Sequence, residues 1–496
     1  MNFLFPNEPG SASRRFFVTS AVWLFIGLGF GFLGAIELVA PDLLPAAAQL
    51  SFGRIRPTHI NIVIFGFLLS AYFGGMLYVV PAVCRTTLIS ERIGNAAVWL
   101  WNAILLGAVY ALPQGYTQGR EYAELPWVLD IAILAAVAVL IYLVFGTIAR
   151  RKERLLYVSA WYLGGGLVWT FFVYAMGNVV WKPASGSWQG MNDQILLWFY
   201  GHNVVGLVIT PPAVALAYYI IPRATRTPIY SHTLSLFGFW ALIVMYTHVG
   251  THHLLQAPAP QWLKVISIVN SIALVVPVFA FLTNVWLPLR DRFGRIYQDV
   301  GAKMVFTGTV WYFVTCVQGP FQSLPAVQRV THFTQWVTAH AHIALLGFAG
   351  FIAMGTVYYL LPLVLKRPLY SRRLGDAQYW LMLLGTLGIF LSLTFAGLIQ
   401  GEAWRNGETV YRVLPELKSY FVVRGISGVM LLCGAGIFVF NVLMTVLGRT
   451  AQVPEPTAAN DGPSVEGPGG GAQPEPPGGG ARPEQPANAV QQEEPA

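Results

Sequence analysis

Long apolar blocks separated by short polar links fill most of the chain, up to about residue 450. Apolar stretches of about 20 residues are typical of transmembrane helices. The pattern therefore predicts an all-α, polytopic membrane protein, with one twelve-helix domain over residues 1–450. The expected transmembrane helices are residues 15–40, 58–83, 94–113, 126–149, 156–180, 193–221, 231–256, 261–288, 303–322, 333–364, 378–400 and 419–448.

Composition changes sharply at the end of the last apolar block. Residues 451–496 are rich in Pro and Gly, are acidic, and contain "GPGGGAQPEPPGGGARPEQP". Such a segment has too little apolar surface to form a core, so we expect a disordered tail.

The charged residues indicate how the helices are oriented. If the N-terminus lies inside, most of the 30 basic residues fall in links on the inner side. Basic residues concentrate in cytoplasmic links, so we expect both termini in the cytoplasm. The net charge of +8 is then a sign of topology and not of a nucleic-acid partner.

Six of the nine histidines fall at a similar expected depth, in the outer half of the membrane. Ionisable side chains at membrane depth are costly and usually functional, and scattered packing residues would not share one level. The six are His59, His202, His252, His253, His340 and His342.

The motif "HAH" at residues 340–342 places two histidines on one expected helix. Residues two apart on an α-helix point about 200° apart. His340 and His342 should therefore serve two centres on opposite sides of the helix. His59 can supply the second ligand of one centre, which leaves the other centre with an open face.

The motif "HH" at residues 252–253 lies near the outer end of the expected seventh helix. Adjacent residues diverge by about 100° on a helix, and near an irregular helix end they can converge on one ion. His202 offers a third imidazole. Three imidazoles without thiolate or carboxylate suit copper or zinc.

A polar stripe is predicted below these histidines. On a continuous helix, Tyr246 lies about two turns from His253 on the same face, and Ser235 lies about three turns further toward the cytoplasm. His232 is close to Ser235. Polar stripes inside membranes often mark proton paths, although hydrogen bonds between helices are the alternative for Ser235 and His232.

Five segments together resemble the catalytic subunit I of haem–copper oxidases, in particular the C-family, cbb-type cytochrome c oxidases and the related large subunit of nitric oxide reductases. The resemblance covers nearly all twelve helices and leaves out the tail. The segments are "RPTHINIVIFG", "FYGHNVVG", "WALIVMYTHVGTHH", "THFTQWVTAHAHIALLG" and "YFVVRGISG".

The resemblance implies a role for each residue that matches the family pattern. His59 and His342 would hold a low-spin haem b, His340 a high-spin haem b. The remaining roles are copper (CuB) ligands for His202, His252 and His253, an active-site tyrosine cross-linked to His202 for Tyr246, calcium ligands for Glu121 and Glu124, and haem propionate contacts for Arg54, Arg56, His332 and Arg424.

The same resemblance implies a respiratory function. It predicts a terminal oxidase of the bacterial inner (plasma) membrane that reduces dioxygen to water with electrons from cytochrome c, coupled to proton uptake. The chain contains no CxxCH motif for covalent haem c. A membrane-anchored cytochrome c subunit is therefore the expected partner.

Two positions depart from one or other family pattern. Gln318 stands in "VQGP", where cbb-type oxidases have a glutamate before Gly-Pro. Gly206 stands where nitric oxide reductases have a metal-binding glutamate, and those enzymes lack the tyrosine that matches Tyr246. An oxidase is favoured over a nitric oxide reductase on this basis. A transporter with a histidine-lined pathway is a third hypothesis.

Overall fold

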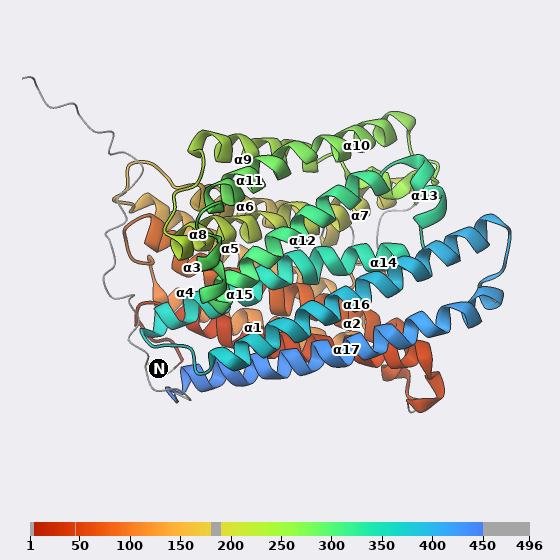
Figure 1. Cartoon of the computed structure of the whole chain (residues 1–496), viewed down its shortest axis with the longest axis horizontal. Helices are drawn as coiled ribbons and strands as arrows, with labels where there is room; N and C mark the ends of the chain where they lie inside the picture. Colours follow the sequence, from red (N-terminus) through yellow and green to blue (C-terminus); the bar gives the residue numbers. More distant parts are fainter. Residues whose placement is uncertain (1–3, 45, 180–189, 450–496) are drawn as a thin grey trace, which may run out of the picture. The chain divides into compact units, whose positions relative to one another are not determined.

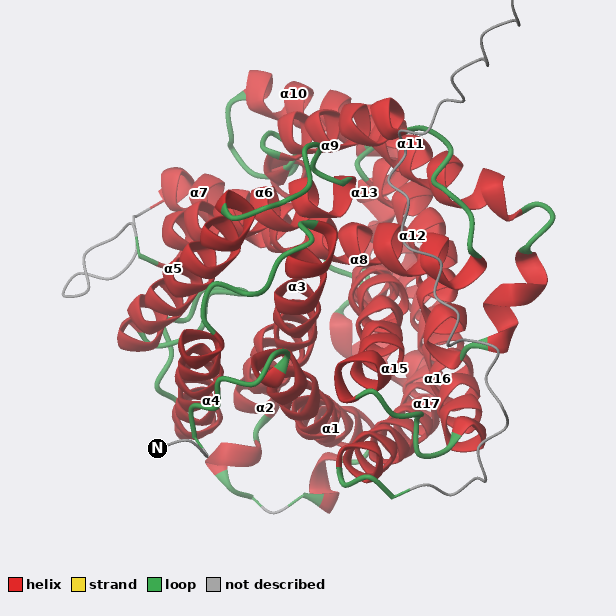
Figure 2. Cartoon of the chain, turned by 90° about the vertical axis from the view of Figure 1, so that its left-hand side faces the viewer, coloured by secondary structure: helices red, strands yellow, loops and turns green. Residues whose placement is uncertain are grey.

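The computed structural model describes residues 4–44, 46–179 and 190–449. The predicted tail, residues 451–496, lies outside the described residues. Within the described ranges the protein is helical and contains twelve segments long and apolar enough to cross a membrane, as predicted. Figures 1 and 2 show these segments side by side, along their length and end-on.

Seven of the twelve spans are single α-helices. They are α1 (Ser11–Val39), α4 (Glu91–Gln114), α5 (Trp127–Ala149), α6 (Val158–Asn178), α12 (Val300–Gln322), α16 (Arg372–Arg405) and α17 (Val410–Val446).

The other five spans change helix type or bend along their length. Three contain a π-helical segment: α2 (Phe52–Asn61), η3 (Ile62–Leu69) and α3 (Ser70–Val83); α7 (Gly190–Asn203), η4 (Val204–Ile209) and α8 (Thr210–Thr225); and α14 (Gln335–His342), η8 (Ile343–Gly350) and α15 (Phe351–Leu365). The remaining two are α9 (His232–Tyr246) with the 3₁₀ segment η5 (Gly250–Leu254), and α10 (Gln261–Ala273) with α11 (Val275–Trp286) and η6 (Leu287–Leu289). The short helix α13 (Pro325–Thr331) precedes α14.

The three spans with π-helical segments are the most buried of the twelve. Their inner halves α3, α8 and α15 lie in the middle of the bundle in Figure 2. In each span the π-helical segment begins within three residues of a predicted ligand, namely His59, His202 or His342. A π-helical turn inserts extra residues into the helix and is frequent at functional sites. The same local distortion therefore recurs wherever a central helix presents a histidine.

The link after each of these spans has the same construction. A basic residue adopts a left-handed conformation, with φ of 49° at Arg85, 54° at Arg226 and 52° at Lys366. A serine then caps the next helix by accepting a hydrogen bond from the backbone N–H three residues later. These serines are Ser90, Ser231 and Ser371. They recur about 140 residues apart, which indicates an internal threefold repeat that the sequence analysis missed.

Small residues allow the central helices to approach closely. A Cβ atom at Gly301 of α12 would lie 2.8 Å from the carbonyl oxygen of Gly355 in α15. Membrane helices use such glycines because close backbone contact replaces the hydrophobic effect as the source of packing energy. The contact fixes α15, and with it the α14 histidines, against α12.

The last two helices are longer than the apolar pattern predicts. The expected spans 378–400 and 419–448 are observed as α16, with 34 residues, and α17, with 37 residues. At about 1.5 Å per residue, each exceeds the roughly 30 Å hydrocarbon thickness. The extra turns carry the ion pairs Arg405–Glu402 and Arg412–Glu408. Hydropathy detects only the part of a helix inside the bilayer, so it misses these charged ends.

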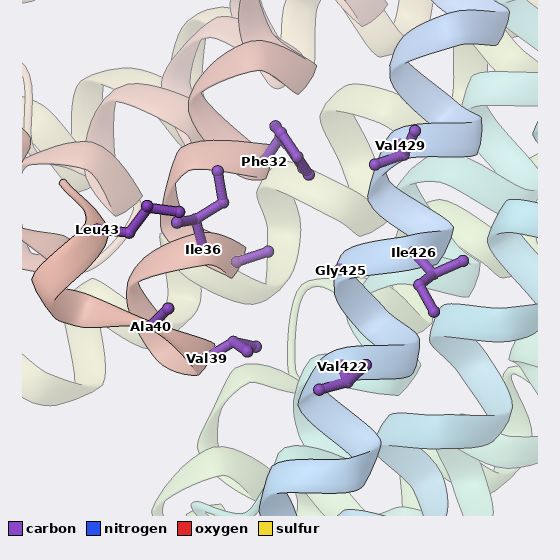
Figure 3. A pocket seen from close by; sticks show the side chains of 10 residues that line it. Phe32, Ile36, Val39, Ala40, Leu43, Val422, Gly425, Ile426 and Val429 are labelled. Atoms are coloured by element: carbon purple, nitrogen blue, oxygen red, sulfur yellow. The ribbon is translucent and has the colours of Figure 1, made fainter.

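An apolar groove of about 280 Å³ lies between the outer part of α1 and α17 (Figure 3). All of its lining side chains are apolar, among them Phe32, Ile36, Val422 and Ile426. Such a lining fits a surface that faces hydrocarbon, and it offers no polar group to hold a metal or to orient a substrate. The candidate chemistry lies elsewhere, in the interior of the bundle.

Candidate active site

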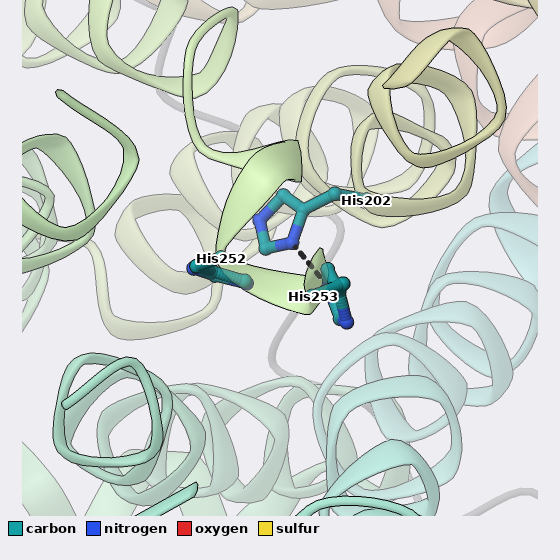
Figure 4. A group of neighbouring side chains, drawn as sticks. All are labelled: His202, His252 and His253. Carbon is teal, nitrogen blue, oxygen red and sulfur yellow. Dashed lines mark hydrogen bonds between the residues drawn. The ribbon is translucent and has the colours of Figure 1, made fainter. Parts of the chain in front are cut away.

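Three histidines converge in the interior. His202 comes from α7, and His252 and His253 come from η5 (Figure 4). One ring nitrogen of each lies within 4.8 Å of the others. His202 Nδ1 is 3.1 Å from His253 Nε2. The described residues add no carboxylate or thiolate to this group, so its donor set fits copper better than non-haem iron.

The local backbone brings the two adjacent histidines together. Helix α9 ends at Tyr246, and the chain turns before the 3₁₀ segment η5 begins at Gly250. A Cβ atom at Gly250 would lie 2.4 Å from the carbonyl oxygen of Trp198, so a larger residue cannot occupy this position without a shift. The Trp198 ring stacks on His253 with a centroid distance of 4.0 Å. Close packing against α7 thus orients one ligand.

The expected continuous helix over residues 231–256 is wrong in its outer part. Because α9 stops at Tyr246, the count of two regular turns from Tyr246 to His253 does not apply. Tyr246 nevertheless reaches the site, with its ring centroid 5.7 Å from that of His202. Tyr246 therefore lies beside His202, which belongs to a neighbouring span, and not beside His253, which belongs to its own span.

Tyr246 occupies space that Gly206 leaves open. A Cβ atom at Gly206 would lie 2.3 Å from Cδ1 of the Tyr246 ring. The tyrosine and any larger side chain at position 206 therefore exclude each other. Positions 206 and 246 separate the oxidase pattern from the nitric oxide reductase pattern. In this protein the two positions are coupled, because a large side chain fits at only one of them.

The two histidines of "HAH" have different neighbours. His340 lies within electrostatic range of His202 and His252. His342 lies within electrostatic range of His59 instead. This difference in neighbours is consistent with the prediction that His340 and His342 serve two centres.

In His59 and His342, hydrogen bonds engage Nδ1 and leave Nε2 free. His59 Nδ1–H donates to the carbonyl oxygen of Gly27, and His342 Nδ1–H donates to that of Thr338, each at 2.7 Å. A carbonyl oxygen only accepts, so each Nδ1 carries the proton and each neutral ring keeps its lone pair on Nε2. Each ring could therefore hold a haem iron through Nε2.

The departure at Gln318 has a visible structural consequence. The side-chain oxygen of Gln318 accepts a hydrogen bond of 2.8 Å from His340 Nδ1–H. Trp336 stacks on the same imidazole at a centroid distance of 5.9 Å. His340 is therefore oriented by a neutral acceptor, where a glutamate would supply a charged one.

The predicted propionate contacts occupy the outer end of the bundle. Arg424 of α17 lies within electrostatic range of His59 and His342. Arg56 forms a 2.6 Å ion pair with Glu121, while Arg54 donates to the carbonyl oxygen of Pro113 at 3.0 Å. His332, at the end of α13, is half-buried, and burial lowers its pKa.

The two predicted calcium ligands have different surroundings. Glu121 is engaged by Arg56. Glu124 is buried and accepts hydrogen bonds of 3.0 Å from Asn61 Nδ2 and from the backbone N–H of Tyr122. Burial raises the pKa of the Glu124 carboxyl. Each carboxylate thus has a protein partner of its own.

The predicted proton-path residues lie on the inward face of α9. Ser235 is fully buried and shares this face with Tyr246. Its hydroxyl donates to the carbonyl oxygen of His232 at 2.6 Å. His232 is half-buried, and its Nδ1 has no hydrogen-bond partner among the described residues. A buried polar atom without a partner is what a water chain would satisfy.

Several contacts to the predicted ligands could not be read from the sequence. Trp198 and Trp336 stack on histidines, and Ser271 accepts a hydrogen bond from His252. Gln318 departs from the family pattern, but its hydrogen bond with His340 was not predicted. Ser267 and Ser271 are four residues apart and therefore share one face of α10. The aromatic residues are indistinguishable from lipid-facing ones until the helices are placed.

Comparison with known proteins gives the class of protein. The family described as Cytochrome C and Quinol oxidase polypeptide I matches residues 11–430. The chain therefore belongs to this family of haem–copper oxidases. A chain of a heme-copper terminal oxidase dimer has the same fold, with a TM-score of 0.69 at 15% identity, over 89% of this chain and 85% of that one.

Relatives within the family indicate which kind of haem–copper oxidase the chain resembles. The chain is 31% identical over 445 residues to the Cbb3-type cytochrome c oxidase subunit CcoN1 of Stutzerimonas stutzeri, covering 87% of this chain and 94% of the relative. It is 32% identical over 450 residues to a cytochrome c oxidase subunit 1 homolog of Agrobacterium tumefaciens, covering 88% and 83%. A nitric oxide reductase subunit of Stutzerimonas stutzeri is more distant, at 26% identity over 87% of this chain and 94% of that protein.

The steric exclusion between positions 206 and 246 predicts the effect of a one-carbon change. Gly206→Ala should displace the Tyr246 ring and lower the free energy of unfolding by about 1–3 kcal/mol, because the added methyl overpacks the interior. Thermal unfolding of the purified protein measures this. Gly425→Ala is the control, since a Cβ atom there meets nothing within 4 Å. Equal melting temperatures for the two variants would contradict the exclusion.

Proposed function

We propose that this protein is the catalytic subunit of a cbb-type cytochrome c oxidase, which reduces dioxygen to water with electrons from cytochrome c. The observation that carries the proposal is the division of the histidines by α14. Three imidazoles and His340 lie on one side, and the pair His59 and His342 lies on the other. Two haems and one copper need this division of ligands.

Each cofactor is assigned to residues whose donor atoms fit it. His59 and His342 would hold the low-spin haem b through Nε2, and His340 would hold the high-spin haem b. Copper (CuB) would be held by the three convergent histidines, His202, His252 and His253. When bound, the haems and copper would supply the electron-transfer and oxygen-reducing chemistry.

Tyr246 favours dioxygen over nitric oxide as the substrate. Breaking the oxygen bond needs a local electron and proton, and a phenol can supply both. The ring of Tyr246 lies beside that of His202, and Gly206 gives it room. In a nitric oxide reductase the glutamate that replaces this glycine would exclude the tyrosine. The covalent link between Tyr246 and His202 that the family has is part of this proposal.

Proton delivery from the cytoplasmic side follows α9. Ser235 and Tyr246 share a buried face, and the unpartnered Nδ1 of His232 lies at its lower end. Each electron that enters a site of low dielectric constant needs a compensating proton, because uncompensated charge there is expensive. The path ends at the phenol that gives up a proton during the reaction.

The outer end of the bundle neutralises the haem propionates. Arg54, Arg56, Arg424 and His332 are the proposed contacts. Glu121 and Glu124 would hold a calcium ion there, and Glu121 would then turn from its ion pair with Arg56. A bound cation would favour the ionised form of the buried Glu124, whose pKa burial raises.

Electrons enter from outside the membrane through a partner. The described helices lack a c-type haem motif, so a membrane-anchored cytochrome c subunit delivers electrons near the low-spin haem. The twelve spans make this a multi-pass membrane protein. Its proposed location is the bacterial inner membrane, with both termini in the cytoplasm, because the basic links then lie inside.

Metal analysis tests the proposed copper site. Three imidazoles without a nearby carboxylate predict about one copper per two haem irons in the purified protein. Elemental analysis gives this ratio directly. A third iron in place of copper, identified by its spectrum, would favour the nitric oxide reductase, and the absence of haem would favour a transporter.

Removal of one axial ligand tests the division of the histidines. His59→Ala should abolish the low-spin haem spectrum and keep a haem that binds carbon monoxide, because His340 serves a separate centre. Difference spectra of the reduced protein with and without carbon monoxide measure both properties. Loss of carbon monoxide binding with an intact low-spin spectrum would reverse the assignment.

The tyrosine separates the two candidate substrates. Tyr246→Phe should retain both haems and copper, because it removes one hydroxyl, but should lose most dioxygen reduction. Oxygen consumption and metal content measure the two effects. Peptide mass analysis of the parent should also show the segments containing Tyr246 and His202 joined. Full oxygen turnover in the variant, together with no joined peptide in the parent, would remove Tyr246 from the mechanism.

A further inference from the structure

Helix α10 buries two residues, and both are serines. Ser267 and Ser271 are buried, while the apolar side chains of this helix are exposed or half-buried. A hydroxyl buried in a membrane is costly unless it is hydrogen-bonded. Both hydroxyls are directed to the segment that carries the adjacent histidines. α10 therefore presents a polar edge to η5 and an apolar surface to the lipid.

The hydrogen bonds of these serines have a definite direction. Ser267 Oγ donates to the carbonyl oxygen of Val249 at 2.5 Å. Ser271 Oγ donates to the carbonyl oxygen of Ser267 at 2.7 Å. A hydroxyl has one hydrogen, so Ser271 can offer only a lone pair to any further neighbour.

That further neighbour is His252. The distance between His252 Nδ1 and Ser271 Oγ is 2.6 Å. Because the serine can only accept here, Nδ1 must carry the proton. The neutral ring then has its lone pair on Nε2. Gln328 donates a 2.7 Å hydrogen bond to the backbone oxygen of the same histidine and holds its main chain as well.

We propose that Ser271 is a positioning residue for the non-haem metal, and that it selects the Nε2 form of His252 before the metal binds. This inference rests on the proposed copper site and identifies what prepares one of its ligands. The other two ligands are oriented differently: the His202 and His253 nitrogens face each other, and Trp198 stacks on His253. His252 is the one whose tautomer is set by a side chain of a peripheral helix.

The experiment compares three substitutions on α10. Ser271→Ala removes the acceptor and should weaken metal retention about 10–100-fold, as is typical when a hydrogen-bond partner of a metal ligand is lost. Ser271→Thr keeps the hydroxyl and should restore retention. Ser267→Ala is the matched control, because it removes an equally buried hydroxyl one turn away that does not contact the His252 ring.

The readout is the non-haem metal that remains per two haem irons after titration with a copper chelator, together with the electron paramagnetic resonance spectrum of the oxidised copper. The low-spin haem spectrum reports that each variant has assembled. If Ser271→Ala does not assemble, Ser271→Cys replaces it, since a thiol of similar size is a weaker acceptor.

Two results would overturn the inference: Ser271→Ala retaining metal as well as the parent, or Ser267→Ala losing as much metal as Ser271→Ala. Neither result contradicts the proposed function if the parent protein contains copper. If the parent protein contains iron at this site, the proposed copper oxidase is contradicted. The role of Ser271 is still tested, because the retention of that iron can be compared between the variants. A parent with no non-haem metal overturns both.

Discussion

The site depends on one constraint, which is that a neutral imidazole inside a membrane protein has one N–H to pair and one lone pair to use. His59 and His342 pair their N–H groups with backbone carbonyl oxygens, and His340 pairs its own with Gln318. His252 does so with Ser271. In each case the other nitrogen is left for a metal. Metal binding then offsets the cost of burying the lone pair, so the ligands are prepared by the fold and completed by the cofactor.

The backbone meets this constraint through repetition. Each central span contains a π-helical segment near its predicted ligand and ends in a link with a left-handed basic residue and a serine cap. A regular α-helix would place side chains at fixed angles of about 100°, whereas the inserted turns change the angle locally. The repeated backbone structure therefore does not determine which residue points inward in each span. This freedom allows one span to carry His202 and another to carry both His340 and His342.

The sequence alone predicted what depends on periodicity and residue type. The apolar blocks predicted the twelve spans. That His340 and His342 face different centres stays a prediction from the "HAH" spacing. The sequence did not predict the end of α9 at Tyr246, although Thr247, His248 and Gly250 interrupt the apolar pattern there. It also missed Trp198 and Ser271, whose roles arise from contacts between different helical segments. The extra lengths of α16 and α17 were missed because a helix continues into water without an apolar signal.

The contact between Gly206 and Tyr246 shows how substrate choice can depend on packing. A carboxylate at position 206 would add a hard oxygen ligand to three imidazoles and favour iron. It would also occupy the volume of the tyrosine ring, since even a Cβ atom there lies 2.3 Å from Cδ1. The metal preference of the site and the presence of a redox-active phenol therefore depend on each other, because the side chains at positions 206 and 246 compete for the same volume. No direct bond between these side chains is needed. A change from one activity to the other requires both positions to change, because either single change leaves a clash or a cavity in the interior.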